Sequence, residues 1–193
     1  MSMQPEVLAK PAAAGPSAPL PPGLPLSARL RAETRGDHLL VDAAYGRFDL
    51  GRRDGYAAFL LAQARVLPAL EALLRPGEMI PAWRGRTAAI LTDLHDLGRA
   101  APAAIAPAIG SGAAARWGAV YVLEGSRLGG AVLARQVPPG LPAAFLGAVH
   151  PSGAWRDLLA RIDAANPAPA AQADAIAAAK ATFAAFASAA SAR

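Results

Sequence analysis

Apolar residues recur every three to four positions along most of this chain, which is the spacing of one face of an α-helix. In the first such segment, residues 27–48, this face contains Leu30, Thr34, Val41 and Tyr45. Further helices are predicted over residues 55–74 (with a kink at Pro68), 87–97, 113–136, 141–149, 152–164 and 170–188. No segment alternates polar and apolar residues over the length of a strand. The pattern therefore predicts an all-α fold.

The composition of the chain changes near residue 26. The first 25 residues contain seven prolines and no continuous apolar segment, so residues 1–26 are expected to form a disordered Pro/Ala-rich arm. The remaining residues, 27–193, are numerous enough for one domain with a substantial core. The whole chain is 54% hydrophobic and rich in alanine, which favours helices. We therefore expect a single-domain helical bundle after the arm.

The charge and the cysteine content exclude several classes of function. Without cysteine the chain forms neither a disulfide framework nor a thiolate metal site, and this absence fits a cytoplasmic protein. The net charge of +5 indicates affinity for anionic partners. Nucleic acid is not expected among them, because no basic helix carries interleaved aromatic residues. A membrane span is not expected either, because no 18 consecutive residues are apolar and uncharged.

Three glycines interrupt a segment that otherwise reads as a helix, "YVLEGSRLGGAVL" over residues 121–133. Each glycine inside a helix costs about 1 kcal/mol relative to alanine. Gly125 and Gly129 are four residues apart, and Gly130 follows Ser126 by four, so these positions form a strip without side chains. Such a strip admits a flat ligand to the backbone, or it allows a second helix to pack closely. Both interpretations are open from the sequence.

Of the three histidines, His38 has the strongest case for binding a ligand. His150 precedes Pro151 and is expected in a loop, whereas His95 is expected on an exposed polar face. His38 shares the apolar face of the first predicted helix, where a histidine is either a core residue or a metal ligand, and a neutral imidazole can bind iron. Arg31 precedes it by seven residues, or about 10 Å along a helix. Its guanidinium is either a solvated charge or a partner for an acidic arm of a flat ligand.

Two motifs resemble those of a known family. The stretch "LRAETRGDHLLVD" over residues 30–42, followed by "GAVYVLEGSRLGGAVL" over residues 118–133, is similar to haem oxygenases, specifically to the bacterial biliverdin-producing branch. Members encoded beside bacteriophytochromes are especially similar. The resemblance covers roughly residues 27–190 and implies an all-α domain that holds haem between a proximal and a distal helix.

The resemblance implies that four residues bind haem. His38 occupies the position of the proximal histidine that holds the iron. Arg31 and Tyr121 match a basic residue and a tyrosine that pair with the haem propionates. Lys180, in the segment "AAAKATFAAF", matches a stretch of the last helix that can add another basic group.

The resemblance also implies a catalytic distal segment made of Gly125, Ser126, Gly129 and Gly130. Animal-type members carry an aspartate in place of Ser126, where it orders the water that delivers protons, but bacterial members with "EGS" turn over without it. The implied reaction cleaves haem, both substrate and cofactor, with O₂ to biliverdin, CO and Fe²⁺. The implied electron donor is an acidic ferredoxin- or flavodoxin-like protein or a reductase, and a bacteriophytochrome is the implied acceptor of the product.

Two rival functions are compatible with these residues. A non-catalytic haem- or bilin-binding protein of the same fold would keep His38 and Arg31 but would not need the glycine strip. A helical interaction domain without haem would use the glycines only for packing. Retention of the strip favours the oxygenase over the first rival.

Overall fold

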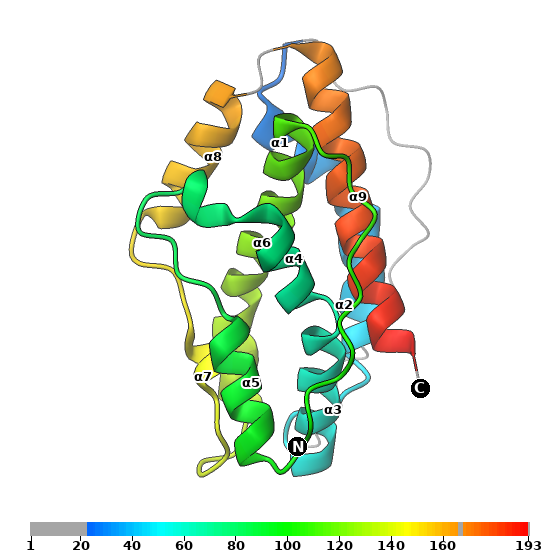
Figure 1. Ribbon diagram of the computed structural model, residues 1–193, viewed down its shortest axis with the longest axis vertical. Helices are drawn as coiled ribbons and strands as arrows, with labels where there is room; N and C mark the ends of the chain where they lie inside the picture. Colours follow the sequence, from blue (N-terminus) through cyan, green and yellow to red (C-terminus); the bar gives the residue numbers. More distant parts are fainter. Residues whose placement is uncertain (1–22, 166–167, 193) are drawn as a thin grey trace, which may run out of the picture.

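The computed structural model describes residues 23–165 and 168–192, and every α-helix predicted from the sequence has a counterpart in it (Figure 1). The α-helices are α1 (Leu26–Glu33), α2 (Arg35–Tyr45), α3 (Arg53–Ala64), α4 (Leu67–Leu74), α5 (Thr87–Asp96), α6 (Ala113–Leu133), α7 (Ala144–Gly147), α8 (Ala154–Ala165) and α9 (Pro169–Ser191). Short 3₁₀ helices occupy Pro76–Glu78 and Ala134–Gln136. Neither described range contains a strand, so the all-α prediction is confirmed. Most of the expected arm over residues 1–26 lies outside the described residues.

The first predicted helix, over residues 27–48, is in fact two helices. α1 ends at Glu33, and α2 begins at Arg35. Between them, Thr34 has φ −104° and ψ 7°, and its hydroxyl donates to the carbonyl of Leu30 at 2.6 Å. A threonine that bonds back to the preceding turn in this way bends a helix. The bend falls between Arg31 and His38, so these two residues belong to different helices.

The predicted helix over residues 55–74 is also divided. α3 ends at Ala64 and α4 begins at Leu67, which puts Pro68 in the first turn of α4, where its missing N–H is not needed. The segment Arg53–Glu78 is long and apolar enough to cross a membrane by length and composition alone, although it contains no 18 consecutive uncharged residues. Of its most apolar window, 56% is buried within the fold. Core helices pass the same test, so this is weak evidence for a span.

The long helices of the second half follow the prediction closely. α6 covers nearly all of residues 113–136, and α9 buries Ile176, Phe183 and Phe186 as expected. α5 ends as predicted before Gly98, whose φ of +69° suits glycine. The helix expected over residues 141–149 is shorter, because only Ala144–Gly147 is helical.

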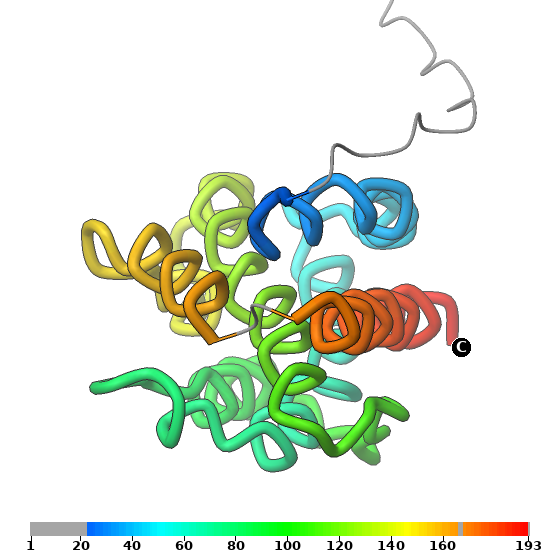
Figure 2. Tube along the Cα trace, turned by 90° about the horizontal axis from the view of Figure 1, so that it is seen from above, coloured from blue at the N-terminus to red at the C-terminus, as the bar shows by residue number. Residues whose placement is uncertain are grey.

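The packing of α6 against α9 forms the centre of the molecule and is the most extensive helix contact within the described residues. It depends on Gly118, because a Cβ there would lie 2.9 Å from the Cα of Ala175 and closer still to its carbonyl. α9 also packs against α2. Seen from above, α1 and α2 lie on one side of α9, and α4 and α5 lie on the other (Figure 2). α9 thus packs against both α2, which carries His38, and α6, which carries the glycines.

α8 packs against both α1 and α6 and so provides a second contact between the N-terminal helices and the glycine helix. Asp163 of α8 accepts hydrogen bonds from the backbone N–H of Ser27 at 2.7 Å and from its hydroxyl at 2.8 Å. The carboxylate thereby satisfies an N–H in the first turn of α1, which has no side-chain cap of its own. This fixes α8 to the beginning of α1.

Candidate functional site

The middle of α6 has one face that is largely uncovered by the rest of the protein. Helical spacing places five residues on it, namely Tyr121, Gly125, Leu128, Gly129 and Val132. Leu128 is 47% exposed and Val132 is 59% exposed, although α6 is otherwise a core helix. Exposed apolar residues gathered on one face indicate a surface that binds something. We call these five residues the open face of α6.

Helix packing does not require the glycines of this segment. A Cβ at Gly129 would meet no atom within 4 Å, and one at Gly130 would lie 3.6 Å from the nearest atom, the carbonyl oxygen of Leu146. A Cβ at Gly125 would lie 3.4 Å from the ring of Trp155, which is an ordinary contact. Gly118 is the glycine of α6 that packing needs. Of the two interpretations of the strip, the structure therefore supports an open surface rather than close helix contact.

His38 lies at the margin of the buried face of α2 and not within it, which corrects the sequence-based placement. Its side chain is 61% exposed and contacts the edge of the Phe183 ring of α9, with 5.7 Å between the ring centroids. Its Nδ1 lies 2.9 Å from a carboxylate oxygen of Asp42. A carboxylate that accepts the Nδ1 proton leaves the Nε2 lone pair available for a metal and orients the ring. The sequence reasoning missed Asp42, although its spacing of four from His38 on one helix is a usable signal.

Of the residues expected to pair with the propionates, Arg31 acts electrostatically on Tyr121. Tyr121 is half-buried on α6, and Arg31 is exposed on α1. Burial raises the pKa of the Tyr121 phenol, and the positive charge of Arg31 opposes part of this shift. Arg31 therefore acts on Tyr121 across the space between α1 and α6. Lys180 is exposed on α9, three residues before the Phe183 that contacts His38.

The hydroxyl of Ser126 is fixed by a buried arginine that the sequence reasoning missed. Arg86 donates through Nη2 to Ser126 Oγ at 2.8 Å and to the carbonyl of Leu123 at 2.7 Å. Ser126 Oγ in turn donates to the same carbonyl at 2.7 Å. Burial lowers the pKa of Arg86 to about 10, with Arg127 adding to the shift and Glu124 and Glu71 opposing it. The guanidinium therefore remains charged at neutral pH.

A buried ion pair between Glu124 and Arg127 also holds the turn of α6 that carries Gly125 and Ser126. Glu124 lies 2.8 Å from Nε of Arg127 and accepts from Trp83 Nε1 at 2.9 Å. Arg127 also donates to the carbonyls of Ala148 and Arg84, which belong to two different loops. Breaking a buried pair of this kind is costly, because it leaves a charge without a partner. The turn that carries Gly125 and Ser126 is thus rigidly held.

The other two histidines behave differently from each other. His95 is exposed on α5, as predicted, although its neighbour Asp93 is buried and accepts from the backbone N–H of Ala144 and Phe145. His150 lies in a loop, as predicted, but its side chain is largely buried and its Nε2 is 3.0 Å from the carbonyl of Glu124. His150 thus belongs to the support of α6.

Comparison with known proteins finds similarity to haem oxygenases. No family model matches the chain. A haem oxygenase of Xanthomonas campestris pv. campestris is 44% identical over 111 residues, which are 54% of this chain and 66%, just under two thirds, of that protein. The crystal structures of the NO- and CO-bound haem oxygenase of Neisseria meningitidis match with a TM-score of 0.73 and 28% identity, over 87% of this chain and 91% of theirs. In sequence and in fold, the chain is thus similar to haem oxygenases. The fold is therefore that of haem oxygenases, as the resemblance of the two motifs implied.

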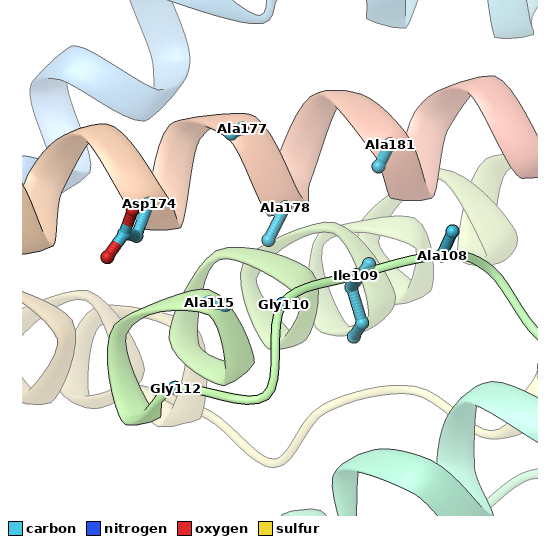
Figure 3. A pocket seen from close by; sticks show the side chains of 9 residues that line it. All are labelled: Ala108, Ile109, Gly110, Gly112, Ala115, Asp174, Ala177, Ala178 and Ala181. Carbon is cyan, nitrogen blue, oxygen red and sulfur yellow. The ribbon is translucent and has the colours of Figure 1, made fainter.

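A separate cavity of about 270 Å³ does not involve any of the residues predicted to act in this haem oxygenase homologue (Figure 3). It lies between the segment 108–112, the first turn of α6 and α9, and Asp174 is the only charged residue among those that line it. Among the described residues, no group of three or more His, Cys, Asp and Glu is placed to hold a metal ion. A site that relies on a single histidine for iron is compatible with this finding.

Proposed function

We propose that this protein is an active haem oxygenase, which cleaves haem with O₂ to biliverdin and releases CO and ferrous iron. The observation that carries the proposal is the open face of α6, where Gly129 has free space around it and packing explains none of the three glycines. A haem-binding protein without catalysis would have no need for such a face. Sequence identity and shared fold with haem oxygenases support the same conclusion.

Haem would be held from two sides. His38 would bind the iron through Nε2, with its Nδ1 oriented by Asp42 at 2.9 Å. Arg31 and Tyr121 would pair with the propionates, and Lys180 would add a further positive charge. These residues suit the group, because a neutral histidine and cationic side chains match an iron centre with acidic arms. Bound haem supplies both the iron that takes up O₂ and the macrocycle that is oxidised.

On the distal side, Gly129 would leave room for O₂ next to the backbone of α6, and Gly125 and Gly130, which have Trp155 and Leu146 as their neighbours, would line the same segment. Ser126 would take part in proton delivery at its Oγ. Arg86 donates to this oxygen at 2.8 Å and so fixes the position of the hydroxyl. Because Arg86 is buried and charged, it would also hold ordered water near the distal face. Ser126 and the buried Arg86 would thus take the role in proton delivery that an aspartate has in animal-type members.

The proposed partners follow from charge and from the family. The net charge of +5 suits an acidic electron donor, either a ferredoxin- or flavodoxin-like protein or a reductase. A bacteriophytochrome would accept the biliverdin. The absence of cysteine fits the proposed location in the cytoplasm.

Addition of hemin to the purified protein is expected to give the sharp Soret band of protein-bound haem, shifted from the broad band of free hemin, and addition of a reductant in air is expected to convert that band into the biliverdin spectrum with release of CO. The measurement separates the rival functions. A Soret band without turnover would identify a non-catalytic haem-binding protein, and the absence of a Soret band would leave only a helical domain without haem.

We expect Arg31→Glu to weaken haem binding. An exposed ion pair contributes about 0.2–1 kcal/mol, which corresponds to an affinity loss of up to about fivefold, and the reversed charge adds repulsion from the propionates. Titration with hemin measures the change. Arg53→Glu, at the beginning of α3, is the matched control, since it makes the same charge change away from the site. Equal affinities of both variants would remove Arg31 from the propionate site.

A further inference from the structure

Trp155 is a large side chain at the edge of the open face of α6, and neither motif contains it. It comes from α8 and is half-buried. Its ring atoms Cη2 and Cζ3 lie 3.4 and 3.8 Å from the point where a Cβ on Gly125 would be. The centroid of its ring is 5.6 Å from that of Tyr121. The indole therefore stands next to the glycine strip at the same end as the tyrosine.

The position of the indole is fixed from several directions. His150 packs against it, with 6.2 Å between the ring centroids, and with its proton on Nε2 it donates to the carbonyl of Glu124. Glu124 is itself held by Arg127 and Trp83. At the other end of α8, Asp163 binds the first turn of α1. A planar side chain held in this way acts as a rigid wall rather than as a mobile cover.

The wall divides the open face of α6 into two unequal parts. At Gly125 the indole is in contact distance, whereas at Gly129, one turn further along, there is free space. A flat ligand lying against α6 must therefore extend from Trp155 toward Gly129 and Val132. If the acidic arms of the ligand pair with Arg31 and Tyr121, these arms lie beside Trp155. The edge of the ligand then has two contacts at different points, one with the indole and one through its acidic arms, and together they restrict rotation of the ligand within its own plane.

We propose that Trp155 is a specificity-determining residue, which fixes the in-plane rotation of haem and thereby selects the meso carbon that is oxidised. This inference rests on the proposed function. For a given face of haem against α6, the in-plane rotation decides which of the four meso carbons faces the distal strip, so a wall on one edge selects among them. The propionate contacts alone leave part of the rotation open, because Arg31 is exposed and its side chain is long.

The test compares Trp155→Phe and Trp155→Ala with Trp117→Phe. Trp117 is on α6 about 12 Å from Gly125 along the axis, so its variant removes an indole without changing the wall. Chromatography of the biliverdin isomers and proton NMR of the cyanide-bound ferric complex report the rotation. We expect a single isomer and one set of haem methyl resonances for the wild type and Trp117→Phe. Trp155→Ala should give a mixture of biliverdin isomers and two sets of haem methyl resonances. Trp155→Phe should also give a second isomer and a second set of resonances, but in smaller amounts.

A structural role alone would lower the melting temperature without changing the isomers. If both Trp155 variants bind haem and form the wild-type isomer with one set of methyl resonances, the inference is overturned and Trp155 is a packing residue. Trp155→Phe keeps an aromatic ring in place, so it decides the question if Trp155→Ala does not fold. A wild-type protein without a Soret band would instead overturn the proposed function, and the inference with it.

Discussion

The His38→Ala variant is expected to lose histidine-ligated haem and all turnover while remaining folded. The side chain of His38 is 61% exposed, and its contacts are an exposed carboxylate and the edge of one ring. Loss of an exposed ion pair costs at most about 1 kcal/mol. By contrast, the iron would lose the one protein ligand that the site offers. Absorption and electron paramagnetic resonance spectra of the ferric complex measure ligation, and the melting temperature without haem measures folding.

His95→Ala is the control for this variant, because His95 is an exposed histidine on α5. It should have the wild-type spectrum and activity. If His38→Ala retained wild-type coordination, a different residue would hold the iron, and the assignment of α2 as the proximal helix would be wrong. External imidazole should restore ligation in His38→Ala, since it can occupy the space that the ring leaves.

The fold could be predicted from the sequence wherever a helix is long and packs on one side. α6 and α9 are each more than 20 residues long with no proline in the helix interior, and α9 consists largely of the strong helix former alanine, so their boundaries were found within a few positions. The interruptions were harder to predict. The bend at Thr34 depends on a hydroxyl that bonds to Leu30 instead of to solvent, and both outcomes are compatible with the same pattern. Pro68 indicated an interruption at the right place, but it lies in the first turn of a new helix, α4, and does not kink a continuous one.

The candidate site, too, could be predicted from the sequence only in part. His38 and the glycines lie in continuous motifs, so local spacing was enough to find them. Arg86 reaches Ser126 from 40 positions earlier in the chain, and Trp155 reaches Gly125 from α8. Contacts between such distant segments depend on how the helices pack, and periodicity within one segment contains no information on this. The sequence also could not show which glycine serves packing, because Gly118 and Gly129 lie on the same helix.

The Gly129→Ala variant is expected to be at least as stable as the wild type and to lose biliverdin formation. A methyl group at Gly129 meets no atom within 4 Å, so the fold does not resist it. Alanine gains up to about 1 kcal/mol of helix propensity, which corresponds to an increase of about 2–4 °C in melting temperature. The same methyl group occupies the space next to the backbone that the proposal assigns to O₂. The melting temperature without haem and the yield of biliverdin measure the two effects separately.

Gly118→Ala is the matched control on the same helix, and the opposite result is expected for it. Its Cβ would lie 2.9 Å from the Cα of Ala175, so α6 and α9 would have to move apart. Overpacking of a helix interface typically costs about 1–3 kcal/mol, so this variant should melt earlier. Because Gly118 is not on the open face of α6, the folded fraction should still form biliverdin in the cold. If instead Gly129→Ala melted early and formed biliverdin at the normal rate, the glycines would serve packing, and the open face of α6 would not be the site of O₂ binding.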